Sequence, residues 1–267
     1  MTPPMKPIIL IPARMASTRL PGKPMADIHG RPMIVHVLLA AQAAGIGPVA
    51  VACDDPAIAA AVTGAGGTAV LVEDDLPSGT DRIERALAVL DPGGVHDVVV
   101  NLQGDLPAIA PGLLRAVLTP LADPAVDIAS LVAPVVSAEE EASPSVVKCA
   151  CAFAPGRDLA PALYFSRQPI PAGEGPLWHH IGLYAYRRAA LTRFVALPAS
   201  PLENREKLEQ LRALEAGMRI AVARVDHAPF GVDTPADLAR ARAVLHPGLA
   251  AQMATQKSTL KEPTSRP

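Results

Sequence analysis

The chain has 267 residues, with 24 Lys and Arg against 26 Asp and Glu, and its net charge of −2 gives no bulk attraction to nucleic acid or to an anionic membrane. Apolar residues make up 50% and charged residues 19%, a balance typical of a globular protein and not of a disordered one. Only 3% of the residues are aromatic, which also argues against stacking platforms for single-stranded nucleic acid.

The N-terminal segment and the cysteines predict a cytoplasmic protein. The first apolar run, at 8–11, is too short for a signal peptide, and no stretch of 18 apolar residues could span a membrane. Cys53, Cys149 and Cys151 cannot all pair within one chain, and the Cys-x-Cys pair lacks the second cluster that a zinc site needs. We therefore expect reduced thiols and no membrane insertion.

Residues 7–25, PIILIPARMASTRLPGKPM, begin as a short buried strand and continue as a basic loop that contains Arg14, Arg19 and Lys23. Open α/β sheets bind ligands in loops at the carboxyl ends of their strands, and cations with free backbone N–H groups suit a polyphosphate. The loop is not a Walker A motif, because Ser17 and Pro24 stand where that motif needs Gly and Ser or Thr. A solvated basic loop without a ligand is the alternative.

The first half of the chain alternates short apolar runs with helical patterns. Strands are predicted at 8–11, 48–53, 68–72 and 97–102, and helices at 33–44, 57–63, 111–121 and in the segment after 78 that carries Ile83, Leu87 and Leu90. This alternation predicts a parallel, doubly wound sheet. Residues 64–69 fit G-x-G-x-x-A, but they follow a helix and enter a strand, the reverse of the dinucleotide-binding order, so an NAD-linked dehydrogenase is excluded.

The second half is less regular. Strands are predicted at 128–136, 146–153, 180–187 and 219–225, with an exposed polar segment at 137–145 and a run at 162–166 that leads to Arg167. Residues 201–216 read as one amphipathic helix, and a final helix ends near residue 245. We expect a flexible tail at 247–267.

Two acids follow or interrupt turn glycines near strand ends, Asp105 in QGD and Asp233 in GVDTP. They could converge on Mg²⁺, which is usually held by one or two carboxylates together with phosphates. Each acid also has an ordinary structural interpretation, Asp105 as a turn former and Asp233 as the first residue of a helix.

Other polar groups are open to two interpretations as well. His180, Tyr184 and Tyr186 share one face of a regular strand, which suits a hydroxyl-rich or carboxylate ligand but is equally typical of packed side chains. Glu209 and Gln210 fall in a helix, where a solvated face is the ordinary explanation. The sequence contains neither a G-x-S-x-G elbow nor an H-E-x-x-H motif, so hydrolase functions are not supported.

Six motifs together closely resemble the 3-deoxy-manno-octulosonate (Kdo) cytidylyltransferase family, the CMP-Kdo synthetases. They are IIPARMASTRLPGKPM ending at Met25, SGTDR at 78–82, NLQGDLP at 101–107, HIGLYAYR at 180–187, LEQLRALEAG at 208–217 and GVDTPADL at 231–238. They occur in the family's order and spacing and span nearly the whole chain to about residue 245. Other sugar nucleotidyltransferases share the first motif in looser form, whereas the later ones indicate the Kdo branch.

The resemblance implies one cytidylyltransferase domain over residues 1–246, with the Rossmann-like mixed α/β sheet of the nucleotide-diphospho-sugar transferases and a smaller sugar-binding and dimerisation subregion. It implies a homodimer that uses Mg²⁺ to transfer CMP from CTP to the anomeric hydroxyl of Kdo, releasing pyrophosphate, for lipopolysaccharide biosynthesis. The positions that match catalytic residues are Arg14, Lys23, Asp105 and Asp233, with the two acids as the metal pair. The positions around the nucleotide are Ala13, Arg14, Lys23, Ser78, Gly79 and Gln103. The positions in segments that resemble the Kdo-binding surface are Gln103, Arg167, His180, Tyr184, Glu209 and Gln210.

The chain departs from the family pattern at two positions. Many members have His two residues before SGT and Glu after QGD, where this chain has Leu76 and Leu106. Related enzymes that activate an amino-substituted Kdo or another nonulosonic acid share much of the pattern, so the exact sugar stays open. A catalytically silent nucleotide- or sugar-binding regulator is the alternative function, and Lys23, Asp105 and Asp233 together argue against it.

Overall fold

The computed structural model describes residues 4–246. The tail predicted at 247–267 lies outside these described residues. Within them, no helix combines the length and the apolar character needed to cross a membrane.

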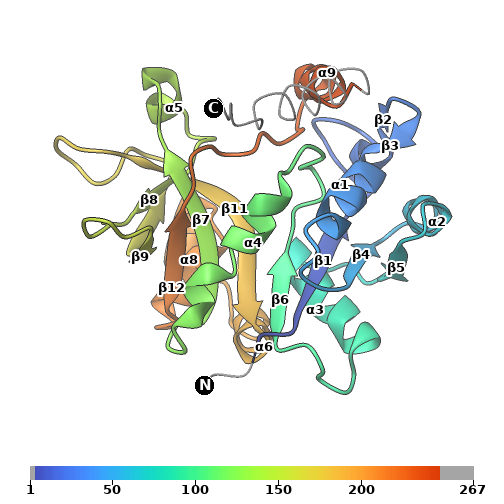
Figure 1. The fold of residues 1–267 in the computed structure, drawn as a ribbon, viewed down its shortest axis with the longest axis horizontal. Coiled ribbons are helices and arrows are strands. Elements are labelled where there is room, and N and C mark those ends of the chain that lie inside the picture. The colour runs from blue at the N-terminus through green and yellow to red at the C-terminus, as the bar shows by residue number, and fades with distance from the viewer. Residues whose placement is uncertain (1–3, 247–267) are drawn as a thin grey trace, which may run out of the picture.

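A mixed sheet of ten strands runs through the described part of the chain (Figure 1). Its first block is parallel and follows the order β5, β4, β1, β6, which confirms the predicted doubly wound arrangement. The chain first builds outward from β1 and then returns to its other side, so a topological switch point lies beside β1. The block consists of β1 (Pro7–Ala13), β4 (Val49–Cys53), β5 (Thr68–Leu71) and β6 (Val98–Asn101).

The second block extends the sheet in both orientations. Strand β11 (Trp178–Arg187) runs antiparallel to β6 on one side and to β7 (Ile128–Pro134) on the other. Strand β12 (Ile220–Arg224) is parallel to β7, and β9 (Leu159–Pro161) forms the edge beside it. Strand β8 (Lys148–Ala150) pairs with both β11 and β10 (Tyr164–Ser166).

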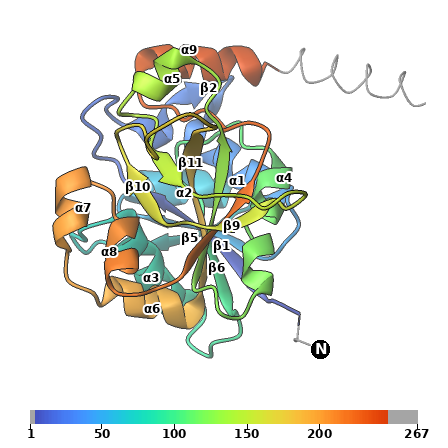
Figure 2. The same cartoon turned by 90° about the vertical axis from the view of Figure 1, so that its left-hand side faces the viewer.

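Alternate residues of β1 belong to two hydrophobic cores, one on each face of the sheet. Ile9 and Ile11 pack with α1 (Met33–Gln42), α2 (Pro56–Gly64) and α4 (Pro111–Ala116). Ile8 and Leu10 pack on the other face with α3 (Gly79–Leu90), α6 (Arg188–Val195) and α8 (Gln210–Glu215), and Figure 2 shows the two groups of helices on opposite sides. A parallel strand with helices on both faces is buried throughout, which explains the uninterrupted apolar run.

The single helix predicted over residues 201–216 is wrong. The structure has α7 (Pro201–Glu206) and then α8, because Lys207 adopts a left-handed conformation with φ of +56° that ends α7. The break lets Leu208 and Leu211 pack into the second core while Glu209, between the two helices, faces Ser78. An amphipathic pattern alone does not report such a break, because it runs through both helices in one period.

Other elements differ from the prediction in length or were not predicted. The helix expected at 111–121 ends at Ala116 and is followed by a 3₁₀ turn, η2 (Thr119–Ala122), with Pro120 in its first turn. The strand expected at 146–153 is reduced to β8. Elements without a clear sequence signal are α5 (Ala138–Ala142), α6, β9 and a hairpin of β2 (Asp27–Ile28) and β3 (Arg31–Pro32). They are short, so their periodicity is too brief to recognise.

Asp91, at the end of α3, connects the turn before β6 to the start of α6. Its carboxylate accepts hydrogen bonds from the backbone N–H groups of Val95 at 2.9 Å and His96 at 2.8 Å, and pairs with Arg188 at 2.5 Å. Burial opposes the charge, but these hydrogen bonds and the guanidinium outweigh it and lower the pKa of Asp91 to about 2.

The stability that Asp91 contributes should therefore depend on pH. A native pKa below the unfolded value means that the contribution is complete above about pH 4 and is lost as the pH falls toward 2. We expect Asp91→Asn to lower the melting temperature at pH 7 by about 3 °C or more, with a difference from the wild type that shrinks below about pH 3. Thermal unfolding followed by circular dichroism at several pH values measures this, and a pH-independent difference would contradict it.

Candidate active site

A polar cleft of about 360 Å³ opens at the carboxyl ends of β1 and β6, at the topological switch point. The loop that follows β1 forms one wall, and the QGD segment after β6 forms the floor. The residues that line it are Pro12, Ala13, Arg14, Ala16, Ser17, Thr18, Arg19, Lys23, Pro24, Gly79, Gln103, Gly104, Asp105 and Asp233. A loop rich in cations at this position can bind an anionic ligand.

The basic loop is anchored at both of its ends. Near its start, the backbone N–H of Met15 donates to the carboxylate of Asp54 at 2.9 Å. At its other end Gly22 has φ of +66°, a left-handed conformation that glycine adopts without a Cβ penalty, and the 3₁₀ turn η1 (Lys23–Met25) follows. Arg14 is exposed at the cleft, whereas the side chain of Lys23 is mostly covered.

Lys23 lies between the two acids that the sequence singled out. Its Nζ is 2.9 Å from Asp105 Oδ2 and 3.0 Å from Asp233 Oδ1, and Arg19 reaches the same Asp233 oxygen at 3.0 Å. Burial favours the neutral amine, but the two carboxylates outweigh it and raise the pKa of Lys23. The ammonium group therefore stays protonated at neutral pH. The carboxylates of Asp105 and Asp233 therefore contact the same cation, the ammonium group of Lys23.

Close packing of three chain segments brings the acids together. A Cβ on Gly104 would lie 2.7 Å from the carbonyl oxygen of Pro12, so only glycine allows the QGD segment to approach β1 this closely. The backbone N–H of Val232 donates to the carbonyl of Asp105 at 2.9 Å, which places the GVDTP segment alongside.

The structure also decides between the two interpretations of Asp233. The helix α9 (Pro235–Val244) begins with a capping box formed by Thr234 and Asp237, so the capping residue is Thr234. Asp233 precedes the cap, and its carboxylate is directed to Lys23 and Arg19. The helix-start role that its sequence context suggested thus belongs to its neighbour.

A small third core holds α9 over the basic loop. It contains Ile28, Met33, Val232, Leu238 and Ala241, with Leu20 and Ala26 packed against it. The guanidinium group of Arg242 donates to the carbonyl of Asp27 at 2.8 and 2.9 Å. Figure 1 shows α9 and the β2–β3 hairpin together at the top of the molecule, although they come from opposite ends of the chain. This packing holds the segment that carries Asp233 at the edge of the cleft, because Val232 belongs to the same core.

The two acids suit a hard cation with a limited set of protein ligands. Within residues 4–246, no group of three or more His, Cys, Asp or Glu side chains is arranged to hold a metal ion. Mg²⁺ characteristically takes one or two carboxylates and completes its shell with water and substrate phosphates. Asp105 and Asp233, which converge on one positive charge, fit that requirement beside a polyphosphate cleft.

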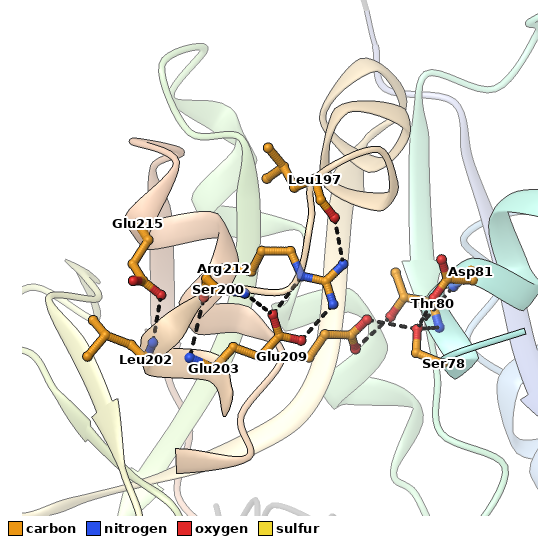
Figure 3. Close-up of polar contacts among 10 residues, drawn as sticks. All are labelled: Ser78, Thr80, Asp81, Leu197, Ser200, Leu202, Glu203, Glu209, Arg212 and Glu215. Atoms are coloured by element: carbon orange, nitrogen blue, oxygen red, sulfur yellow. Dashed lines mark hydrogen bonds and ion pairs between the residues drawn. The ribbon is translucent and has the colours of Figure 1, made fainter. Parts of the chain in front are cut away.

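A second polar cluster joins the start of α3 to the segment between α7 and α8 (Figure 3). Ser78 caps α3, and its hydroxyl lies 2.5 Å from Asp81 Oδ2 and 2.8 Å from Glu209 Oε1. Thr80 Oγ1 donates to Glu209 Oε2 at 3.1 Å. Burial raises the pKa of Glu209, while the two hydroxyl groups and the positive charge of Arg212 oppose the rise.

Arg212 keeps this cluster in place from the α8 side. Its guanidinium group binds both oxygens of Glu203, with nitrogen–oxygen distances of 2.6 and 2.8 Å. Glu203 in turn completes a capping box with Ser200 at the start of α7. A bidentate pair of this kind is geometrically specific, so it fixes α7 and α8 relative to each other.

His180, Tyr184 and Tyr186 do lie on one side of β11, and their rings form a row in which His180 and Tyr186 are buried and Tyr184 is half-buried. Neighbouring ring centroids are 5.5 Å apart from His180 to Tyr184 and 5.8 Å apart from Tyr184 to Tyr186. His180 Nε2 is 2.9 Å from the hydroxyl of Ser130, and burial lowers its pKa to about 3. The imidazole is therefore neutral at physiological pH. Its predicted contact with a sugar stays a prediction.

Arg167 lies apart from the cleft, in contact with the end of α7. Its side chain donates to the backbone carbonyls of Pro144, Glu206 and Lys207 at distances of 2.8 to 3.2 Å. The bonds to Glu206 and Lys207 satisfy carbonyls left open where α7 ends, and the bond to Pro144 connects this end to the segment before β8. A sugar-binding role for Arg167 is a further prediction, and Gln210, at the start of α8, is buried at 6% exposure.

The predicted site residues thus fall into two groups and two outliers. The cleft gathers Ala13, Arg14, Lys23, Gly79, Gln103, Asp105 and Asp233. Ser78 and Glu209 meet in the cluster of Figure 3, with Tyr184 near Glu209 and with His180 next to Tyr184. Arg167 makes its hydrogen bonds at the end of α7, and Gln210 is buried at the start of α8. The sequence reasoning named Arg19 only as a cation of the basic loop, not as a partner of Asp233, and it missed Thr80, although Thr80 stands inside the SGTDR motif.

The two departures from the family pattern are accommodated by packing. Leu106 is 7% exposed and belongs to the first core, close to Gly231. Leu76 is half-buried against the second core, on the loop before Ser78. Both leucines therefore replace polar groups with apolar contacts and leave the carboxylates around Lys23 unchanged.

The sequence and the fold match a known class of transferases. A sequence profile of the Cytidylyltransferase family matches residues 8–220. The solved structure of a CMP:2-keto-3-deoxy-manno-octonic acid synthetase complexed with CTP superimposes with a TM-score of 0.81 at 43% identity, covering 90% of this chain and 98% of that one. A 4-diphosphocytidyl-2C-methyl-D-erythritol synthase, with a TM-score of 0.61 at 15% identity over 91% of this chain and 99% of that one, shares the fold.

Similar sequences show which family of cytidylyltransferases the chain belongs to. The 3-deoxy-manno-octulosonate cytidylyltransferase of Rhodospirillum centenum is 62% identical over 251 residues, covering 94% of this chain and 98% of the relative. That of Xanthobacter autotrophicus is 65% identical over 239 residues, covering 89% and 93%. The chain therefore belongs to the 3-deoxy-manno-octulosonate cytidylyltransferase family.

Proposed function

We propose that the protein transfers CMP from CTP to the anomeric hydroxyl of Kdo and releases pyrophosphate. The observation that carries this proposal is Lys23, held between Asp105 and Asp233 at the switch point of a cytidylyltransferase fold. Family membership supplies the two substrates, and the cleft supplies the charges that a triphosphate needs. A silent regulator on the same fold would have no use for this arrangement.

The residues of the cleft suit attack on the α-phosphate without a covalent intermediate. Such a reaction mainly needs in-line positioning and neutralisation of the charge that develops on pyrophosphate. Lys23, protonated because its pKa is raised, provides a fixed positive charge on the cleft floor, and Arg14 adds an exposed positive charge to the cleft lining. Asp105 and Asp233 would hold Mg²⁺, which supplies Lewis-acid activation of the phosphate.

The sugar is proposed to lie on the β11 side of the cleft. Gln103 lines the cleft directly after β6, and β11 is the neighbouring strand that carries His180 and Tyr184. Glu209 reaches the same region from the segment between α7 and α8. The family resemblance further supports a homodimer, a cytoplasmic location where CTP is made, and a role in lipopolysaccharide biosynthesis.

Pyrophosphate release tests this function directly. The purified protein is mixed with each of the four nucleoside triphosphates against Kdo, an amino-substituted Kdo and sialic acid, with Mg²⁺ present. We expect release with CTP and Kdo that exceeds every other pair by at least about tenfold, because a hydrogen-bonding site strongly rejects ligands that leave its polar groups unpaired. Release with the amino analogue above that with Kdo would reassign the sugar. No release with any pair would favour the regulator.

A further inference from the structure

A line of hydrogen bonds connects Glu209 to the cleft through two residues with no assigned role. Thr80 Oγ1 is 3.1 Å from Glu209 Oε2, and Asn101 Nδ2 is 3.4 Å from Thr80 Oγ1. Gln103 Nε2 is 3.3 Å from Asn101 Oδ1. Thr80 and Asn101 are 3% and 1% exposed, whereas Gln103 lines the cleft beside Asp105. The line thus runs through the interior and ends at the cleft floor.

The carboxylate at one end decides the direction of every bond in the line. The hydroxyl of Thr80 donates its single proton to Glu209 Oε2, the direction that an ionised carboxylate requires because it can only accept. The oxygen of Thr80 then accepts from the NH₂ group of Asn101, which turns the Asn101 oxygen toward Gln103. Gln103 must offer its own NH₂ group to that oxygen. The amide oxygen of Gln103 then faces the cleft and can accept a hydrogen bond there.

The reversed orientation of the two amides is unfavourable while Glu209 is ionised. If Thr80 donated to Asn101, its oxygen would face the carboxylate with no proton between them, and leaving a buried acceptor unpaired is unfavourable. The charged groups around the carboxylate are Arg212 and Asp81, which act in opposite directions. Tyr186 forms a further hydrogen bond with Thr80, and burial raises the pKa of Tyr186, so its phenol stays protonated.

We propose that Thr80 and Asn101 are positioning residues that fix the Gln103 amide with its oxygen toward the cleft, where it accepts a hydrogen bond from a sugar hydroxyl. Within residues 4–246 that oxygen has no hydrogen-bond donor from the protein. Asn101 lies opposite Tyr184 in the β6–β11 pair, which places Gln103 at the border between the basic loop and β11. The identity of the ligand rests on the proposed function, whereas the orientation of the amide does not.

Two matched variants of Thr80 test the proposal kinetically. Thr80→Val keeps the shape of the side chain but removes the hydroxyl, and Thr80→Ser keeps the hydroxyl. We expect Thr80→Val to lower kcat/KM for Kdo by about tenfold, mainly through KM, and to change KM for CTP by less than about twofold. Thr80→Ser should stay within about threefold of the wild type. Wild-type kinetics in Thr80→Val, or an equal loss in both variants, would overturn the proposal.

Nuclear magnetic resonance of the Gln103 side-chain NH₂ group tests the orientation of the amide directly. In protein labelled with ¹⁵N at glutamine side chains, the Gln103 signal is identified by its loss in Gln103→Met. We expect it to be shifted and slow to exchange in the wild type and in Thr80→Ser, and to move toward the values of a free glutamine in Thr80→Val. Glu209→Gln, which can also donate, should broaden or displace the signal, and it serves if Thr80→Val fails to fold. Unchanged signals in the folded variants would refute the fixed orientation.

The two proposals fail in different ways. If the wild type releases no pyrophosphate from CTP and Kdo, the proposed function is wrong, and the amide signals still decide the orientation of Gln103. If the wild type is active and Thr80→Val matches it in kinetics and in spectrum, the function stands and the positioning role of Thr80 is wrong.

Discussion

Asp105→Ala is expected to reduce turnover about a thousandfold or more and to weaken its dependence on Mg²⁺. Removing a single group that stabilises charge in a transition state already costs about 10²- to 10³-fold. Asp105 acts twice, because it is one of two carboxylates available to the metal and the nearest partner of Lys23, at 2.9 Å. Steady-state turnover measured across a series of Mg²⁺ concentrations tests this directly.

The matched control for Asp105 is Asp27, an exposed acid outside the cleft lining. Asp27→Ala should leave turnover and the Mg²⁺ dependence within about twofold of the wild type, since a surface carboxylate of this kind contributes little. Because Asp105 also accepts a backbone hydrogen bond from Val232, which the substitution retains, the fold should survive. Near-normal turnover with unchanged Mg²⁺ dependence in Asp105→Ala would refute the metal role.

Lys23→Ala should impair both turnover and CTP binding. The variant loses the protonated amine on the cleft floor and leaves Asp105 and Asp233 without their shared counter-ion. Two carboxylates facing an anionic triphosphate repel it, so we expect KM for CTP to rise about tenfold and kcat to fall about a hundredfold. Initial rates at varied CTP with saturating Mg²⁺ and sugar separate the two effects.

Arg19→Ala is the matched control for Lys23. Arg19 pairs with the same oxygen of Asp233 at 3.0 Å, but 65% of its side chain is exposed, and an exposed ion pair contributes little. Its effect on KM for CTP should therefore be several times smaller than that of Lys23→Ala. An unaffected Lys23→Ala enzyme would show that the basic loop is only a solvated loop.

The parallel block of the sheet could be predicted because apolar runs and helical periodicity extend over only a few neighbouring residues. The apolar run of β1 and the strand–helix alternation predict four parallel strands in a doubly wound block, and the structure has them. The same patterns fail at Lys207, where one residue with φ of +56° divides a predicted helix in two. That break depends on the packing of Leu208 and Leu211 into the second core, which no periodicity reports.

The chemistry of the cleft was readable from the sequence, but its geometry was not. The basic loop, QGD and GVDTP made Lys23, Asp105 and Asp233 candidates for a polyphosphate and metal site, and the family resemblance favoured that interpretation. Each acid alone had an ordinary structural interpretation. Only the structure shows that Thr234 caps α9 and that the carboxylate of Asp233 is directed to Lys23.

What the sequence by itself determined was the class of sheet, the family and the residues able to carry charge chemistry. The tertiary structure determined which of these residues are in contact with one another. Lys23 and Asp233 are 210 positions apart, and Ser78 and Glu209 are 131 apart. Both contacts depend on helices packed by hydrophobic burial, α9 over the β2–β3 hairpin and α8 against the second core. Burial is non-directional and sums over many side chains, so local patterns locate the groups and only the assembled core sets the distances between them.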